Sequence, residues 1–155
     1  MKNTRNLGWL ICIAWLLTAC LKPAPTSGKL GERIDYKGYI MTVANIDITQ
    51  DFPNARKARE GDKLVAVELI VESNVRSGVH ISPSHVRLVD GSRREYKPRT
   101  TGKAPFLKEQ FDIPKGTSVR GWLTFEVPQS VRKLTLVNEL PQDFKYVEIS
   151  VLLEE

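Results

Sequence analysis

The stretch that decides the fold lies late in the chain and reads Pro114-Lys115-Gly116-Thr117-Ser118-Val119-Arg120-Gly121-Trp122-Leu123-Thr124-Phe125-Glu126-Val127-Pro128. The proline and glycine at its start suit the dihedral angles of a tight turn. Apolar residues and one glycine then occupy every second position: Val119, Gly121, Leu123, Phe125 and Val127. Polar residues lie between them: Ser118, Arg120, Thr124 and Glu126. Because side chains alternate between the two faces of a strand, this pattern predicts the central strand of a β-sandwich, buried on one face and ended by Pro128.

Further strand patterns recur along the chain, with turn signals between them. β-Branched and aromatic residues predict strands at residues 39–48, 63–73, 85–89, 93–97, 133–138 and 144–153, and a short extended piece at 79–81. The segment 63–73 has alternating Val and Leu on one face and a partly apolar second face, so it is expected to be central. Asp90-Gly91 is a hairpin-turn dipeptide. Since no amphipathic helix with capping residues is visible, we predict an all-β, antiparallel β-sandwich.

The order of several motifs resembles a family of bacterial secreted and lipid-anchored immunoglobulin-like domains of unknown function. The motifs are Glu60-Gly61-Asp62-Lys63-Leu64-Val65-Ala66-Val67-Glu68-Leu69, Ser82-Pro83-Ser84-His85-Val86-Arg87-Leu88-Val89-Asp90-Gly91, Tyr96, and residues 113–128. They cover most of residues 36–138. The resemblance implies an immunoglobulin-like sandwich, similar in fold to the immunoprotective extracellular antigen of mycobacteria, and it supplies no catalytic residues.

The N-terminus carries the features of a secretory signal. Lys2 and Arg5 precede an apolar run at residues 7–17. This run is shorter than the roughly 20 residues that a membrane-spanning helix needs. A charged start, an apolar middle and a small-residue cleavage site are typical of a signal peptide. The sequence Leu17-Thr18-Ala19-Cys20 resembles the bacterial lipobox, which implies cleavage before Cys20 and a diacylglycerol on its thiol. A signal anchor, or an ordinary secretory signal with a chance cysteine, are the alternatives.

This interpretation sets the expected domain boundaries and the location. Residues 1–19 form the signal peptide, residues 20–31 form a lipidated flexible tether rich in Pro and Gly, and residues 32–155 form one immunoglobulin-like domain. Cys12 lies in the removed part, so Cys20 is left alone and no internal disulfide is expected. We expect the protein in the bacterial cell envelope. Residue 21 is Leu rather than the Asp that resembles an inner-membrane retention signal, so the outer membrane is favoured where the organism has one.

Charge and motifs argue against several classes of function. Without the signal peptide the chain has 21 basic and 18 acidic side chains, which does not suggest nucleic-acid binding. No nucleophile elbow, phosphate-binding glycine loop or glycosidase-type carboxylate pair is recognisable, so we predict a non-enzymatic protein without a cofactor. His80, His85 and Asp90 are the metal ligands that can be imagined. Zinc needs three or four convergent ligands, and Asp90 is better explained by the hairpin turn, so no metal site is predicted.

Trp122 is the one tryptophan that remains after signal cleavage, and the alternation places it opposite Phe125. As a functional residue it is a candidate contact for a partner, because exposed aromatic side chains often anchor interfaces. The simpler interpretation, which we favour, covers it with a neighbouring loop or with the aliphatic stems of Arg120 and its neighbours.

Basic residues in three loops suggest a surface that faces the membrane. If successive strands are antiparallel, the loops at 74–84, 97–105 and 129–133 collect at the end where the tether enters. The candidate membrane-facing residues there are Lys97, Arg99, Lys103, Arg132 and Lys133. Each Lys or Arg near an anionic surface can contribute about 1 kcal/mol. The alternative, rated somewhat higher, is that these are ordinary solvated loop charges.

Two hypotheses for the function follow. The first is a tethered, non-enzymatic interaction module that binds another envelope protein through its loops or a sheet edge. The second is a small-molecule carrier or sensor with a pocket between the sheets or under the loop at residues 98–105, although the chain has no obvious surplus of apolar residues to line it. The oligomeric state is left open.

Replacing Cys20 tests the anchor directly. We expect Cys20→Ser to abolish signal processing and to remove the protein from the lipid-anchored fraction, because the thiol that would carry the diacylglycerol is gone. Detergent extraction and fractionation of cells that express the two forms measures this. A variant that is processed and stays in the membrane fraction like the original contradicts the lipobox assignment.

Overall fold

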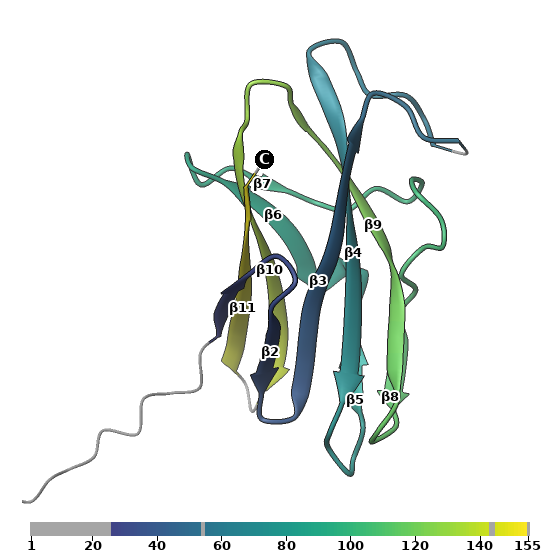
Figure 1. Cartoon of the computed structure of the whole chain (residues 1–155), viewed down its shortest axis with the longest axis vertical. Helices are drawn as coiled ribbons and strands as arrows, with labels where there is room; N and C mark the ends of the chain where they lie inside the picture. Colours follow the sequence, from purple (N-terminus) through teal and green to yellow (C-terminus); the bar gives the residue numbers. More distant parts are fainter. Residues whose placement is uncertain (1–25, 54, 143–144, 155) are drawn as a thin grey trace, which may run out of the picture.

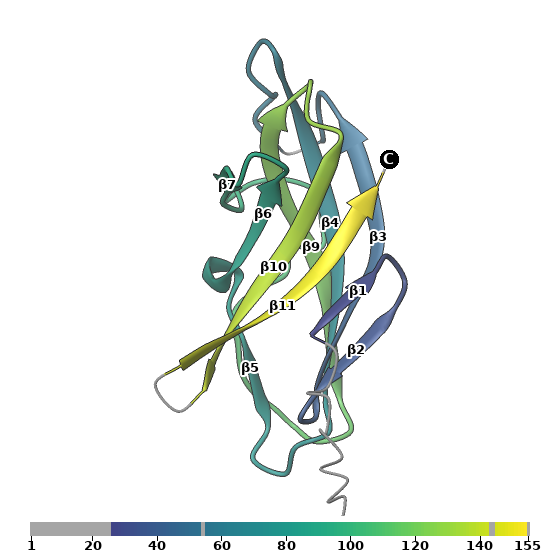
Figure 2. The same ribbon diagram turned by 90° about the vertical axis from the view of Figure 1, so that its left-hand side faces the viewer.

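Two β-sheets face each other in the structure, a computed structural model that describes residues 26–53, 55–142 and 145–154. The elements are β1 (Ser27–Lys29), β2 (Arg33–Tyr36), β3 (Tyr39–Thr49), β4 (Asp62–Ser73), β5 (Val79–Ile81), the short 3-10 helix η1 (Pro83–His85), β6 (Val86–Asp90), β7 (Glu95–Tyr96), β8 (Gln110–Ile113), β9 (Ser118–Pro128), β10 (Lys133–Gln142) and β11 (Lys145–Glu154). In this part of the chain one sheet has the order β1-β11-β10-β6-β7, and the other has the order β2-β3-β4-β9. Figures 1 and 2 show them stacked as two layers. The predicted all-β sandwich is confirmed.

The pairing of β4 with β9 forms one side of the four-stranded sheet, in which β4 is an internal strand and β9 is the last strand. The prediction that residues 118–128 form a central strand is therefore wrong, because an alternation of apolar and polar residues identifies a buried face and not the number of neighbouring strands. The two strands are antiparallel over their whole length, from Asp62 opposite Pro128 to Glu72 opposite Ser118. Their inner faces carry the residues that the alternation predicted, and Phe125 and Val67 are completely buried. Leu134, Leu136 and Leu153 come from the opposite sheet to complete the same core. The expected burial of Leu123 and Phe125 is therefore confirmed.

A bulge in β3 changes which residues of this strand face the core. The register against β4 shifts between Val43 and Asn45. Before the bulge, odd-numbered residues such as Met41 and Val43 lie in the core. After it, Ile46 packs against the core, whereas Asn45 bonds to Glu68 on the other face of the sheet. One extra residue reverses the alternation in this way because side chains in a strand repeat every two residues.

A buried amide joins the two sheets. Asn138 of β10 is completely buried, and its Nδ2 donates to the hydroxyl oxygen of Tyr39 on β3 at 2.7 Å. Burial raises the pKa of Tyr39, and the hydrogen bond from Asn138 opposes this shift in part. A neutral phenol at this position adds no charge to the core.

Several predicted boundaries are corrected. Ser27–Lys29 forms β1, parallel to β11, so the folded domain includes residues before Glu32. The physical reason is that β11 has an open backbone edge, which this segment occupies. His85 belongs to η1 rather than to the strand that follows. The signal peptide, Cys20 and the predicted first residue of the last strand, Phe144, lie outside the described residues.

The predicted sorting of loops between the two ends of the sandwich is wrong. The turn at residues 129–132 lies against the start of β4, where the N–H of Gln129 donates to the carbonyl of Gly61 at 2.9 Å. The turn at 114–117 lies at the other end, and the N–H of Gly116 donates to the carbonyl of Ser73 at 2.8 Å. The prediction assumed that connections alternate simply between ends, but the short segments β5, η1, β7 and β8 break that alternation (Figure 1).

Phe125→Ala tests the core. It should lower the free energy of unfolding by about 3–5 kcal/mol, because removal of a fully buried ring leaves a cavity. Phe106→Ala is the matched control; this ring is 42% exposed, so its loss should change stability by less than about 1 kcal/mol. Urea unfolding of both variants without the signal peptide measures the effect, and similar midpoints for the two would contradict the assigned core.

Candidate functional site

The outer face of the four-stranded sheet, opposite the core, is covered by a loop. We call residues 97–107 the covering loop. Trp122 lies beneath it, 9% exposed, and packs with Phe52, Leu64 and Ala66. The N–H of Trp122 donates to the carbonyl of Pro105 at 2.8 Å, and its own carbonyl accepts from Leu107 at 3.0 Å. The structure thus places Trp122 where the simpler interpretation expected it. Trp122 also lines a pocket of about 490 Å³ together with residues 97–101, and a partner contact at Trp122 stays a prediction.

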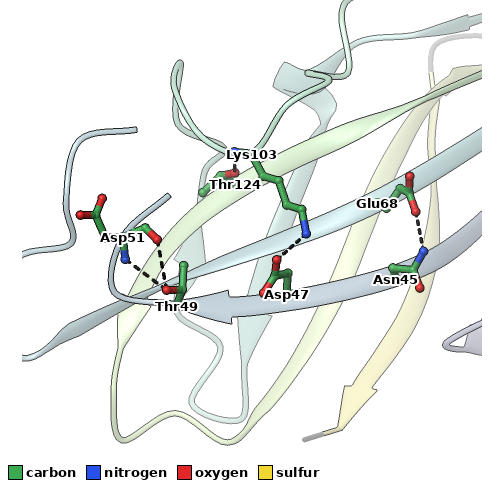
Figure 3. Close-up of polar contacts among 7 residues, drawn as sticks. All are labelled: Asn45, Asp47, Thr49, Asp51, Glu68, Lys103 and Thr124. Atoms are coloured by element: carbon green, nitrogen blue, oxygen red, sulfur yellow. Dashed lines mark hydrogen bonds and ion pairs between the residues drawn. The ribbon is translucent and has the colours of Figure 1, made fainter. Parts of the chain in front are cut away.

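Polar contacts hold the covering loop to the sheet. The N–H of Lys103 donates to the hydroxyl of Thr124 at 3.0 Å, and the Lys103 ammonium pairs with the carboxylate of Asp47 (Figure 3). This ammonium also lies 4.0 Å from the centroid of the Trp122 ring, a cation–π contact. Arg99 donates its N–H to the carbonyl of Thr124 at 2.7 Å, and its guanidinium lies 3.6 Å from the carboxylate of Glu126. These two cations therefore fasten a loop to a sheet.

A close approach of backbones makes this covering possible. A methyl group at Gly121 would lie 2.5 Å from the backbone nitrogen of Leu107, which is too near for any side chain there. Glycine at this position of β9 lets the covering loop lie directly along the strand. The periodicity of β9 did not reveal this role, because Gly121 only continued the core-facing series.

A carboxylate on the same outer face is held by two neighbours. Glu68 of β4 is 5% exposed, and Arg120 of β9 donates to its two oxygens at 2.6 and 2.9 Å. Asn45 of β3 donates to the same carboxylate at 2.6 Å (Figure 3). The hydrogen bonds from Arg120 lower the pKa of Glu68, although burial opposes the shift. This cluster ties three neighbouring strands together, and its groups are already engaged with one another.

The five basic residues predicted to face a membrane come from two segments of the chain. Lys97, Arg99 and Lys103 belong to the covering loop, whereas Arg132 and Lys133 lie at the turn between β9 and β10, beside the start of β4. Their contact with a membrane stays a prediction.

The two histidines are neighbours, but Asp90 is not with them. The rings of His80 and His85 lie edge to face with centroids 6.1 Å apart, and His80 Nε2 lies 3.4 Å from the carboxylate of Glu109. Asp90 accepts hydrogen bonds from Ser92, Arg94 and Tyr96 within its hairpin. The backbone N–H of Arg94 is the main cause of its lowered pKa. The described residues contain no cluster of three or more metal-ligating side chains.

A groove between the two sheets is the strongest candidate site. It has a volume of about 870 Å³, within the range of about 300–1,000 Å³ typical of small-molecule sites. We call it the inter-sheet groove and define it by its lining residues: Leu30, Asn45, Ile46, Ile48, Thr49, Gln50, Lys63, Val65, Gln129, Arg132, Leu134 and Leu153. Its position follows from the fold. Strand β2 pairs with β3 only as far as Thr42, and the rest of β3 continues beyond β2. The apolar side chains Ile48 and Leu30, respectively 39% and 45% exposed, line it.

The charge of the groove has one sign. Among the described residues that line it, the charged side chains are Lys63 and Arg132, and none is acidic. Lys63 is 6% exposed and lies on the same face of β4 as Val65 and Val67, which is the face toward the core. A lysine this little exposed at a core-facing position is unusual, because burying a charge is costly. Sequence reasoning missed Lys63, although its place in the alternation of β4 was a signal.

This architecture defines the class of protein first: small β-sandwich domains. Among similar solved structures is ycdA of Bacillus subtilis, a candidate lipoprotein, with 12% identity and a TM-score of 0.65; the match covers 79% of this chain and 38% of that one. The yjhA protein of the same organism has 18% identity and a TM-score of 0.63, over 82% and 99% of the two chains. MPT63, a secreted protein of Mycobacterium tuberculosis, has 15% identity and a TM-score of 0.54, over 84% and 98%. At these identities the likeness shows the fold.

The particular family follows from the sequence: the chain belongs to the family of the DUF4352 domain, a domain of unknown function, whose model matches residues 28–146. The match begins within β1, in agreement with the corrected domain boundary. No protein with a curated description matches the sequence significantly. Because nearly the whole of yjhA and of MPT63 is matched, the sandwich is a unit that exists as a chain on its own. Nothing in the family or these structures indicates catalytic activity.

Gly121→Ala tests the close contact under the covering loop. The added methyl group should push residues 106–107 off β9, expose Trp122 and destabilise the domain by about 1–3 kcal/mol, as overpacking does. Trp122 fluorescence should shift to longer wavelength in the folded protein. Gly91→Ala is the matched control, since nothing lies within 4 Å of the added group there. An unshifted spectrum with unchanged stability would show that the loop is not held against Gly121.

Proposed function

We propose that the chain is a non-enzymatic lipoprotein of the bacterial cell envelope, tethered through Cys20, whose sandwich is a binding domain. The sequence Leu17-Thr18-Ala19-Cys20 supports the tether. The candidate lipoprotein and the secreted protein among the similar structures are consistent with an envelope or extracellular location. The described residues include no helix long and apolar enough to cross a membrane. The outer membrane is the proposed site where the organism has one.

The binding site that we propose is the inter-sheet groove, and its occupant is a small amphipathic molecule. The observation that carries this proposal is the groove itself: six of its twelve lining residues are apolar, among them Ile46, Val65 and Leu153, and the other six are polar or charged. Small-molecule sites combine apolar walls with polar groups that orient the ligand, and this mixed lining suits an amphipathic molecule. The domain would then act as a tethered carrier or sensor.

Binding of another envelope protein is the second candidate. Within the described residues, β2 pairs with β3 only from Tyr39 to Thr42, and Gly31 adds one hydrogen bond at Val43. The edge of β3 from Asn45 to Thr49 therefore pairs on one side only, with β4. An extended segment of a partner could add to such an edge, with backbone hydrogen bonds providing affinity.

Native mass spectrometry of residues 21–155 after incubation with an envelope lipid extract tests the first candidate. We expect one small amphipathic molecule per chain. Ile48→Trp should reduce the bound fraction at least about tenfold, because the larger ring fills the groove. Thr135→Trp is the matched control: it lies on β10 next to Leu134, on the opposite face of its sheet.

The same material separates the two candidates. A photo-crosslinking residue at position 49, on the β3 edge, reports an added strand. A single recurring protein adduct there, with no small molecule bound in the groove, contradicts the first candidate and supports the second.

A further inference from the structure

We propose that the inter-sheet groove binds a single-chain amphiphile with an anionic headgroup, which lies at Lys63 and Arg132 while the alkyl chain lies between the sheets. This inference rests on the proposed function, because it names the ligand class for the same site. It also specifies the charge of the ligand's headgroup and the orientation of the ligand in the groove, which the apolar lining alone does not determine.

The first step is the position of the cations. Lys63 is the second residue of β4 and pairs with Val127 near the end of β9. Arg132 and Gln129 lie in the turn that follows β9, and the N–H of Gln129 bonds to the carbonyl of Gly61, next to the start of β4. The cationic side chains that line the groove therefore belong to one end of the sandwich. Both already interact within the protein, so the proposal requires only that their positive charge borders the cavity.

The second step is the apolar part of the groove. From the end that carries Lys63, the core-facing series of β4 continues to Val65, and the opposite wall is formed by Leu134 and Leu153, which are paired neighbours on β10 and β11. The bulge in β3 turns Ile46 toward the same space. An alkyl chain can bury its methylene groups against these side chains, and each buried methylene strengthens binding through the hydrophobic effect.

The third step is the choice among occupants. The charged residues that line the groove among the described residues are both basic, so a cationic amphiphile would meet charge of its own sign, whereas an anionic headgroup meets the opposite charge. A carboxylate or phosphate monoester matches the charge of Lys63 and the planar donors of Arg132. The groove volume of about 870 Å³ suits one chain.

Competition binding tests the class of ligand. Residues 21–155 are titrated with 11-(dansylamino)undecanoate, and the bound probe is displaced by laurate, dodecanol or dodecylammonium, which share one chain length. We expect laurate to bind about tenfold more tightly than dodecanol, the factor that corresponds to about 1.4 kcal/mol for one favourable charge contact. Dodecylammonium should bind most weakly.

Substitutions identify the groups responsible. Lys63→Met keeps most of the side-chain volume and should weaken laurate about tenfold, with dodecanol unchanged within about twofold. Lys63→Arg should retain laurate binding, and Arg132→Gln should weaken it less than Lys63→Met, since Arg132 is exposed. Lys103→Met is the matched control, because this half-buried lysine lies on the outer face of the same sheet. Thermal unfolding confirms that each variant is folded. If Lys63→Met does not fold, the comparison of Lys63→Arg with Arg132→Gln decides.

Different results would overturn the proposed anionic headgroup and the proposed binding function of the groove. Equal affinity for laurate and dodecanol, or no loss of laurate binding in either charge-removing variant, overturns the anionic headgroup and leaves the groove as a binding site. No binding of any of the three amphiphiles overturns the proposed function as well. Displacement of the probe that persists in Ile48→Trp overturns both, because the ligand then binds elsewhere on the protein.

Discussion

The antiparallel pairing of β4 with β9 is the constraint on which the other parts of the structure depend. These are long strands with continuous register, so the faces of one determine the faces of the other. Val65 lies opposite Phe125 and Val67 opposite Leu123, and this sheet face meets the β6, β10 and β11 sheet in the core. On the reverse face, Glu68 lies opposite Trp122 and Ile70 opposite Arg120. The assignment of β4 and β9 side chains to the core or to the covered outer face is a consequence of this one pairing.

The two faces of the four-stranded sheet are covered in different ways. The inner face is buried by apolar packing, whereas the outer face is partly closed by the covering loop through Thr124, Asp47 and a cation–π contact at Trp122. Individual exposed ion pairs contribute little to stability. Here the ion pairs and the backbone hydrogen bonds of Trp122 together hold the covering loop over the indole of Trp122. The inter-sheet groove, in contrast, is lined from several distant segments and stays open.

Local patterns predicted the parts of the fold that depend on local chemistry. The alternation at residues 118–128 was sufficient to assign the buried face of β9, and Asp90-Gly91 was sufficient to place a hairpin, because Asp90 accepts bonds from its own turn. The bulge before Asn45 was not predicted, since an extra residue in a strand leaves no composition signal. The loop ends were assigned wrongly because strand order depends on long-range pairing. The groove could not be predicted as a whole, but Lys63 within an apolar alternation was a visible indication.

The short strand β1 has a mechanical consequence for a chain held at Cys20. It is attached by three residue pairs to β11, and a few backbone bonds near Gly31 and Lys29 continue that attachment. Under the proposed anchoring, a pull along the tether would act on these bonds first, because they form the attachment nearest to Cys20 among the described residues. Release of residues 26–32 from the sheet would lengthen the proposed tether by about 25 Å, at roughly 3.5 Å per extended residue. Under the proposed anchoring at Cys20, detachment of β1 would therefore lengthen the tether while the strands that form the core stay paired.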